Sequence, residues 1–128
     1  MIVDASALLA VLRVEPEEPL FSGAMADAPV LRMSPVSWFE AAMNAEKEGA
    51  GDFAALEKLA RHLDLKIVPV DEAQMRLAHQ AWRRYGKGKH PARLNMGGCF
   101  AYALAKHSGE ALLYKGGDFA RTDVIAAV

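Results

Sequence analysis

Short apolar segments alternate with longer helical stretches along the whole chain, and this alternation limits the possible folds more than any other feature. The strand-like segments are residues 2–3, 30–33, 65–70, 111–114 and 124–128. The helical stretches are residues 5–12, 16–28, 34–48, 53–63, 71–85 and 97–107. Strands that alternate with helices favour a parallel sheet covered by helices on both faces. We therefore predict an α/β fold with a central parallel sheet of four or five strands.

The composition is typical of one globular domain. The chain has 128 residues, of which 52% are hydrophobic and 24% charged, so it can bury one sizeable core. Its single cysteine, Cys99, excludes an internal disulfide framework and a cysteine-based zinc site. A net charge of −1 gives no overall attraction to nucleic acid or membrane. Because the sequence shows neither a signal peptide nor an apolar run of ~18 residues, we expect a cytoplasmic protein with no membrane association.

Carboxylates that follow strands are the first candidates for a site, because ligands of such folds bind at the carboxyl ends of the strands. Asp4 directly follows the first strand, where it could face a site or cap the next helix. Asp118 follows the strand at residues 111–114 through a Gly-Gly turn that leaves room for a ligand. Asp123 comes five residues later and, taken alone, is better explained as part of a polar turn.

Glu40 is unusual for its place in a helical pattern. Val36, Phe39, Glu40 and Met43 follow the spacing of one helix face, so Glu40 shares an apolar stripe. An unpaired charge on a buried stripe is costly. Glu40 therefore belongs to a site, or it lies at the edge of the stripe or pairs with an arginine.

Together, Asp4, Glu40 and Asp118 predict a metal site, because three distant segments would bring carboxylates to one edge of the sheet. Two unit charges about 4 Å apart repel by ~4 kcal/mol at an effective dielectric near 20. Such a cluster persists only if it is protonated or binds a cation, and oxygen donors favour Mg²⁺ or Mn²⁺. These ions support phosphodiester hydrolysis.

A local basic cluster could attract a phosphate backbone, although a solvated surface explains it equally well. It consists of Arg83, Arg84, Lys87, Lys89, His90 and Arg93. A receiver domain or a haloacid-dehalogenase-like phosphatase would share the fold class. The latter needs a second aspartate two positions after Asp4, where this chain has Ser6.

Four segments, taken in order, carry a family resemblance: MIVDASALLAVL, SPVSWFEAAMN, LNMGGCFAYALAK and LLYKGGDFARTDV. With them the chain resembles the PIN-domain ribonucleases, and within these the VapC toxins of bacterial toxin–antitoxin pairs. The resemblance extends over nearly the whole chain and implies a single PIN domain over residues 1–128. It places Asp4, Glu40 and Asp118 on acidic positions of the family.

The resemblance also assigns weaker positions and shows one departure. Asp123 matches an acidic position often seen in the last motif, and Ser6 and Thr122 match polar residues that support the acids. The third motif of the family reads Leu-Asn-x-Gly-Asp-Cys, with the aspartate as a metal ligand. In this chain Gly98 stands at that position.

The function that the resemblance implies is a Mg²⁺- or Mn²⁺-dependent endoribonuclease toxin. Asp4 and Asp118 would bind the metal directly, and Glu40 directly or through water. The implied partners are RNA, a VapB-like antitoxin and a second copy, as a homodimer within a toxin–antitoxin hetero-oligomer. Because of Gly98, we expect activity to be weakened or absent. The alternatives are a non-catalytic PIN-domain protein that binds antitoxin and RNA without cutting, and cleavage of DNA by the same acids.

Overall fold

A four-stranded parallel sheet forms the centre of the structure. The computed structural model describes the backbone of residues 1–128 and every side chain except that of Ala50. The sheet has the order β3-β2-β1-β4, and every pair is parallel. The strands are β1 (Ile2–Val3), β2 (Arg32–Met33), β3 (Lys66–Ile67) and β4 (Leu112–Leu113). The predicted α/β class and parallel sheet are thereby confirmed.

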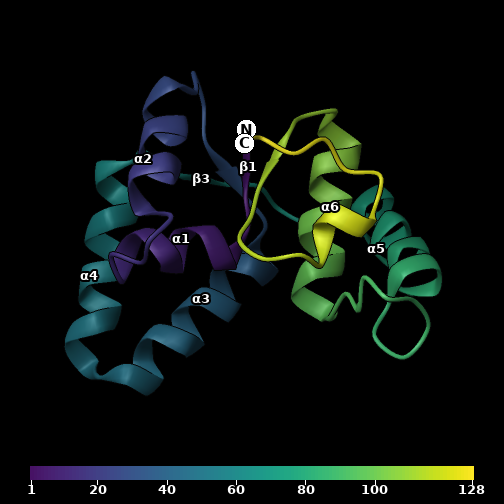
Figure 1. The fold of residues 1–128 in the computed structure, drawn as a ribbon, viewed down its shortest axis with the longest axis horizontal. Coiled ribbons are helices and arrows are strands. Elements are labelled where there is room, and N and C mark those ends of the chain that lie inside the picture. The colour runs from purple at the N-terminus through teal and green to yellow at the C-terminus, as the bar shows by residue number, and fades with distance from the viewer.

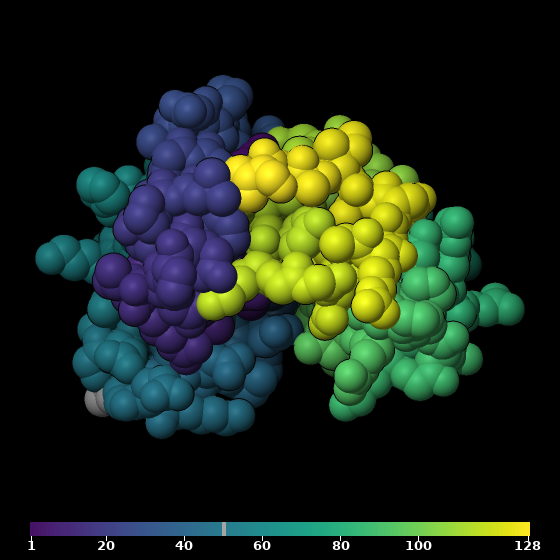
Figure 2. Space-filling model, viewed as in Figure 1, coloured from purple at the N-terminus to yellow at the C-terminus, as the bar shows by residue number. Residues whose placement is uncertain are grey.

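Helices cover the two faces of the sheet unequally (Figure 1). One layer contains α1 (Ala5–Leu12), α2 (Glu18–Asp27), α3 (Pro35–Glu48) and α4 (Ala50–His62). The other layer contains α5 (Glu72–Tyr85) and α6 (Met96–Ser108). In the space-filling view, the blue and teal half is separated from the green half by a notch at the lower edge (Figure 2).

Alternate residues of the central strands supply the two cores. Ile2 and Leu112 pack against α5 and α6, whereas Val3 and Leu113 pack against the layer of α1–α4. All four side chains are buried. Because successive strand residues point to opposite faces, both neighbours in each pair must be apolar when helices cover both faces of the sheet.

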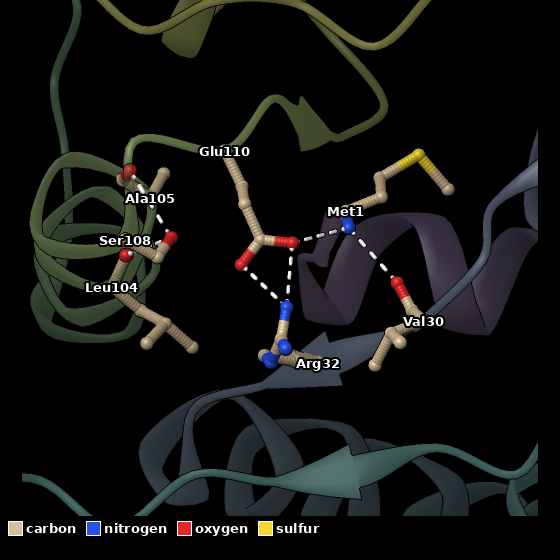
Figure 3. Close-up of polar contacts among 7 residues, drawn as sticks. All are labelled: Met1, Val30, Arg32, Leu104, Ala105, Ser108 and Glu110. Atoms are coloured by element: carbon tan, nitrogen blue, oxygen red, sulfur yellow. Dashed lines mark hydrogen bonds and ion pairs between the residues drawn. The ribbon is translucent and has the colours of Figure 1, made fainter.

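The amino ends of the strands are held together by Glu110 (Figure 3). Its carboxylate accepts hydrogen bonds of 2.7 Å from the N-terminal ammonium group and 2.8 Å from Arg32. Burial disfavours the charged carboxylate, but these two cations outweigh that effect and lower the pKa of Glu110. The opposite edge of the sheet, where the carboxyl ends lie, is left for a site.

Three details differ from the sequence-based expectations. The expected strand at residues 124–128 is reduced to one bridge between Ala126 and Leu112. The helix expected to begin at Phe53 begins at Ala50, directly after α3. The helix expected to begin at Pro16 begins two residues later, at Glu18. Within the described residues, no helix is long and apolar enough to span a bilayer.

The buried face of α3 is also not the predicted one. Its buried residues are Ser37, Ala41 and Ala45, while Phe39 is 63% and Met43 41% exposed. Small side chains at four-residue spacing let a neighbouring helix approach closely, and α3 packs against α1, α4 and α6. Of the large apolar side chains of α3, Phe39 and Met43 therefore lie outside the core, whereas Trp38 packs against it.

Candidate active site

The structure brings Asp4, Glu40 and Asp118 to one cavity of about 130 Å³. Asp4 follows β1, Glu40 lies in α3, which follows β2, and Asp118 follows β4. The three carboxylates therefore meet from segments that are distant in the sequence but adjacent at the carboxyl edge of the sheet. Gly98, in the first turn of α6, borders the same cavity, as expected.

Asp4 is fixed by its neighbour Ser6. One carboxylate oxygen, Oδ2, accepts hydrogen bonds from the Ser6 amide at 3.0 Å and the Ser6 hydroxyl at 2.6 Å. Asp4 thus caps α1, so capping and a place in the site hold together. The Ser6 hydroxyl also accepts a 3.0 Å hydrogen bond from the Lys115 amide, which ties the end of β1 to the segment after β4.

Glu40 is half-buried, and its carboxylate lies against the first turn of α6. A Cβ atom added at Gly97 would lie 1.6 Å from Glu40 Oε2 and 2.8 Å from Glu40 Cδ. A side chain at position 97 would therefore displace this carboxylate from its present place. The N-terminal end of a helix also favours a negative charge, so the contact places Glu40 where it is electrostatically tolerated.

Asp118 is positioned by the turn after β4. Gly116 has a φ of 94°, a conformation that residues with a side chain rarely adopt. The chain then enters the short 3₁₀ helix η1 (Phe119–Arg121), which Asp118 precedes. In the described structure the Asp118 side chain makes no capping hydrogen bond to η1. Its carboxylate is therefore not committed to local structure in the way that Asp4 is.

The carboxylates repel one another across the cavity. Burial raises the pKa of Asp4, and the charge of Asp118 raises it further, although the Ser6 hydrogen bonds act in the opposite direction. Burial likewise raises the pKa of Glu40, with a smaller contribution from the charge of Asp4. A cation in the cavity would counteract both effects, because it would compensate the buried negative charge.

The donors fit a hard divalent cation in kind but not in number. The cavity offers carboxylate oxygens and the side-chain amide of Asn95, which suit Mg²⁺ or Mn²⁺. Among the described side chains, however, no three acidic, histidine or cysteine groups are close enough to hold an ion. Gly98 provides no donor on the α6 side of the cavity.

Position 98 has room for a side chain. A Cβ atom added there would lie 3.3 Å from Asn95 Oδ1, 3.4 Å from Leu94 Cδ2 and 3.5 Å from Phe119 Cζ. These are contacts that small side-chain shifts can relieve. Gly98 is therefore not required by packing.

The structure does not bring Asp123 to the cavity. Its Oδ1 accepts a 2.7 Å hydrogen bond from the Tyr102 hydroxyl, and its Oδ2 lies 3.1 Å from Lys106 Nζ. The Tyr102 hydrogen bond and the Lys106 charge outweigh partial burial and lower the pKa of Asp123. Thr122 Oγ1 donates to the Phe119 carbonyl at 2.7 Å and so supports η1 rather than contacting an acid. The weaker expectation for Asp123 is thereby corrected, because a tyrosine and a lysine already hold its carboxylate.

The cavity also contains residues that the sequence reasoning did not assign to it. Asn95, Leu94, Lys115 and Phe119 line it. The Asn95 side chain caps α6 by accepting a 2.8 Å hydrogen bond from the Gly98 amide. Asn95 could have been identified as a helix cap, because it is a polar residue shortly before a pair of glycines at a helix start. No sequence pattern indicates that Lys115 or Phe119 lines the cavity.

Comparisons with known proteins agree with this geometry. The sequence model of the PIN domain family matches residues 1–125. A Ribonuclease VapC from Mycolicibacterium smegmatis is 46% identical over 127 residues, covering 98% of each chain. Ribonuclease VapC28 from Mycobacterium tuberculosis is 40% identical over 130 residues, covering 100% of this chain and 98% of its own.

Solved structures show the same fold at lower identity. Mycobacterium tuberculosis VapC20, described as a sarcin-ricin loop cleaving toxin, superimposes with a TM-score of 0.75 at 18% identity, covering 97% of this chain and 95% of its own. A toxin-antitoxin complex from Klebsiella pneumoniae has a TM-score of 0.72 at 16% identity, covering 99% of this chain and 97% of its own. Family model, relatives and fold all point the same way: the chain belongs to the PIN domain family and, within it, to the VapC ribonucleases.

Proposed function

We propose that this chain is a toxin that hydrolyses RNA phosphodiester bonds with the help of a divalent metal ion. One observation supports this most directly: three carboxylates from remote segments line one cavity at the carboxyl edge of the sheet. The relatives of 40% to 46% identity are named ribonucleases. Carboxylates that repel one another in a partly buried cavity are suited to a cation rather than to an apolar ligand.

Each residue has a separate task in this proposal. Asp4, held by Ser6, and Asp118, uncommitted to η1, would bind the ion directly. Glu40, set back against Gly97, would bind it directly or through a water molecule. A bound Mg²⁺ or Mn²⁺ would supply an activated water and compensate the charge of the phosphate. The protein orients the carboxylate oxygens and concentrates their negative charge in the cavity.

Gly98 favours a second candidate function. Without a donor at position 98, the described acids do not form a three-ligand group, so metal affinity is expected to be low. In this alternative the chain is a non-catalytic PIN-domain protein that binds antitoxin, with or without RNA, and does not cut.

A matched pair of substitutions tests the assignment. Asp118→Asn removes a charge from the cavity, whereas Asp123→Asn makes the same change five residues later, outside it. We expect Mg²⁺- or Mn²⁺-dependent cleavage of a mixed RNA pool to be lost in the first variant and retained in the second. Chelator controls and thermal melts exclude contamination and misfolding. Cleavage that survives Asp118→Asn would reject the site. If neither the original chain nor either variant cleaves RNA, the non-catalytic binding function is favoured. A DNA pool in the same assay tests cleavage of DNA.

The proposed partner is a VapB-like antitoxin that crosses this cavity. A negatively charged cavity attracts arginine, whose guanidinium pairs with carboxylates in a bidentate manner. Phe39 and Met43, exposed on the same helix as Glu40, offer apolar contacts beside it. We expect a structure of the complex to place an arginine or lysine of the antitoxin near Asp4, Glu40 or Asp118. A complex that leaves the cavity open would contradict this mode of inhibition.

The proposed assembly is a homodimer within a toxin–antitoxin hetero-oligomer, acting in the cytoplasm on cellular RNA. Light scattering of the chain alone and with its antitoxin measures both states. A chain that is monomeric at all concentrations, alone and in the complex, would contradict the dimer.

A further inference from the structure

A second cavity lies beside the carboxylates, between α5 and α6, and we refer to it as the α5–α6 groove. It has a volume of about 470 Å³ and is lined mainly by Met75, His79, Trp82, Met96 and Phe100. Leu94 and Asn95 line both this groove and the carboxylate cavity. The two sites are therefore separated by a single wall at the start of α6.

The groove exposes an aromatic surface that the core does not need. The sequence pattern puts Trp82 on the apolar stripe of its helix, but Trp82 is 45% exposed, and Ala78, Ala81 and Tyr85 supply the buried face. The His79 ring is nearly parallel to the Trp82 ring, at 17°, with the ring centroids 6.1 Å apart. His79 and Trp82 thus form a stacked pair, and the part of the Trp82 ring that remains exposed can stack against a flat ligand.

The surroundings of this platform are positively charged. The exposed ammonium group of Lys89 lies 4.3 Å from the centroid of the Trp82 ring, and Lys87 lines the groove. Both belong to the basic cluster predicted from the sequence. Among the described residues that line the groove, none is acidic. An aromatic surface next to lysine cations combines the two features that bind single-stranded nucleic acid: stacking for a base and positive charge for a phosphate.

We propose that the α5–α6 groove binds one nucleobase of the RNA strand, adjacent to the phosphate that enters the carboxylate cavity. This inference rests on the proposed ribonuclease function, and it adds a subsite that stacks a base on Trp82. The shared wall of Leu94 and Asn95 makes the two sites neighbours along one strand. Stacking tolerates any base, so the subsite contributes affinity and register rather than a strict sequence preference.

Charge argues for RNA over a second copy of the chain as the occupant. In a two-fold contact through this face, the second copy would have to supply acidic partners for Lys87 and Lys89, and none of the described residues that line the groove is acidic. A polyanion instead has the complementary charge.

Tryptophan fluorescence tests the proposal without catalysis. The chain has two tryptophans; Trp38 lies in α3 in the opposite layer, where it is partly buried and packs against the other core. In a Trp38→Phe variant all tryptophan emission comes from Trp82. With excess chelator present to prevent cleavage, we expect a short single-stranded RNA of mixed sequence to quench this emission. We expect an abasic strand of the same length, which keeps the phosphates, to leave it unchanged.

Affinity measurements with labelled RNA complete the test. Trp82→Ala should weaken binding about tenfold, Trp82→Phe should restore part of the loss, and Trp38→Phe should bind like the original chain. Because Trp82 is already 45% exposed, its removal should not prevent folding; if it does, the quenching experiment and Trp82→Phe still decide.

Several results would overturn the proposal. They are RNA that binds without quenching Trp82, equal quenching by the abasic strand, no RNA binding at all, and Trp82 emission that changes with protein concentration alone. The last result would assign the groove to self-association. Cleavage without quenching would reject the groove and keep the ribonuclease, whereas quenching without cleavage in any metal would keep the groove and reject the ribonuclease.

Discussion

Replacing Gly98 by aspartate should convert an incomplete set of ligands into a functional one. Space is available, because a Cβ atom at position 98 has its nearest contact at 3.3 Å, with Asn95 Oδ1. The residue lies in the first turn of α6 and borders the carboxylate cavity. Gly98→Asp therefore adds a carboxylate on the side of the cavity opposite to the strand ends, without rebuilding the backbone.

The effect on stability follows from two opposing terms. Glycine is about 1 kcal/mol worse than alanine inside a helix, and an acidic residue in the first turn gains about 0.3–1 kcal/mol, so the local terms favour the substitution slightly. Against this, two unit charges 4 Å apart repel by about 4 kcal/mol at an effective dielectric of 20, which is an upper bound for the added repulsion. We expect metal-free Gly98→Asp to be about 1–2 kcal/mol less stable than the original chain, a decrease in Tm of several degrees. Adding Mg²⁺ or Mn²⁺ should reverse the loss.

The isosteric Gly98→Asn variant is the matched control, because it fills the same space without the charge. In the assay, the original chain and both variants receive the same RNA pool with metal, and again with chelator. We expect Gly98→Asp to cleave at least about tenfold faster than the other two, a difference of about 1.4 kcal/mol in activation free energy. As the metal concentration is raised, Tm should begin to increase at a lower concentration in Gly98→Asp than in the other two proteins, since its ligand set is the most complete.

The original chain would refute this reasoning if it already cleaves as fast as Gly98→Asp under the same metal concentration. Position 98 would then not be a required ligand in this chain. Equal gains from Gly98→Asn would show that volume or helix stability, rather than charge, limits activity.

Three further predictions follow from individual contacts. Gly97→Ala would place a methyl group 1.6 Å from the present position of Glu40 Oε2, so the flexible Glu40 side chain must turn away. We expect little loss of unfolding free energy, because alanine is the better helix former, but weaker metal binding in calorimetry; an unchanged affinity would show that Glu40 is not a ligand. Ser6→Ala removes the hydroxyl that donates to Asp4 at 2.6 Å; we expect denaturant unfolding to show a cost of about 1–3 kcal/mol, and a cost near zero would mean that water replaces it. The pKa of Glu110 is lowered in the folded state, so its charge stabilises the fold above its unfolded pKa, and this contribution is lost as the pH falls through its folded pKa. Glu110→Gln should therefore be less stable than the original chain by about 1 kcal/mol at pH 7, and this stability difference should shrink in acid. A stability difference that grows in acid would contradict the assignment.

Sequence patterns predict the class of fold and two of the three carboxylates of the site, Asp4 and Asp118, for a clear physical reason. Alternation of strands and helices leaves a parallel sheet as the simplest way to bury every apolar segment. Once the sheet is parallel, residues that follow strands must meet at one edge, so Asp4 and Asp118 could be paired without coordinates. The helical stretches predicted to begin at residues 34 and 71 were likewise correct, because Ser34 and Asp71 cap these helices through local hydrogen bonds.

Contacts between distant segments had to come from the tertiary structure. Glu40 was singled out because it shares a stripe with Phe39, yet the stripe is not the buried face of α3. What keeps Glu40 at the site is the space left by Gly97, a residue more than fifty positions away. No periodicity within one helix can encode such a contact.

Which of two similar groups joins a site is also decided by packing. Asp118 and Asp123 lie in one motif, but Tyr102 and Lys106 engage Asp123 and leave only Asp118 at the cavity. Trp82 has the spacing of a core residue, yet smaller neighbours on α5 fill the core and leave its ring exposed. By itself the sequence determined the sheet and the edge where the chemistry belongs. The tertiary structure decided which side chains reach that edge, because helix faces compete for a limited buried surface and only one arrangement packs closely.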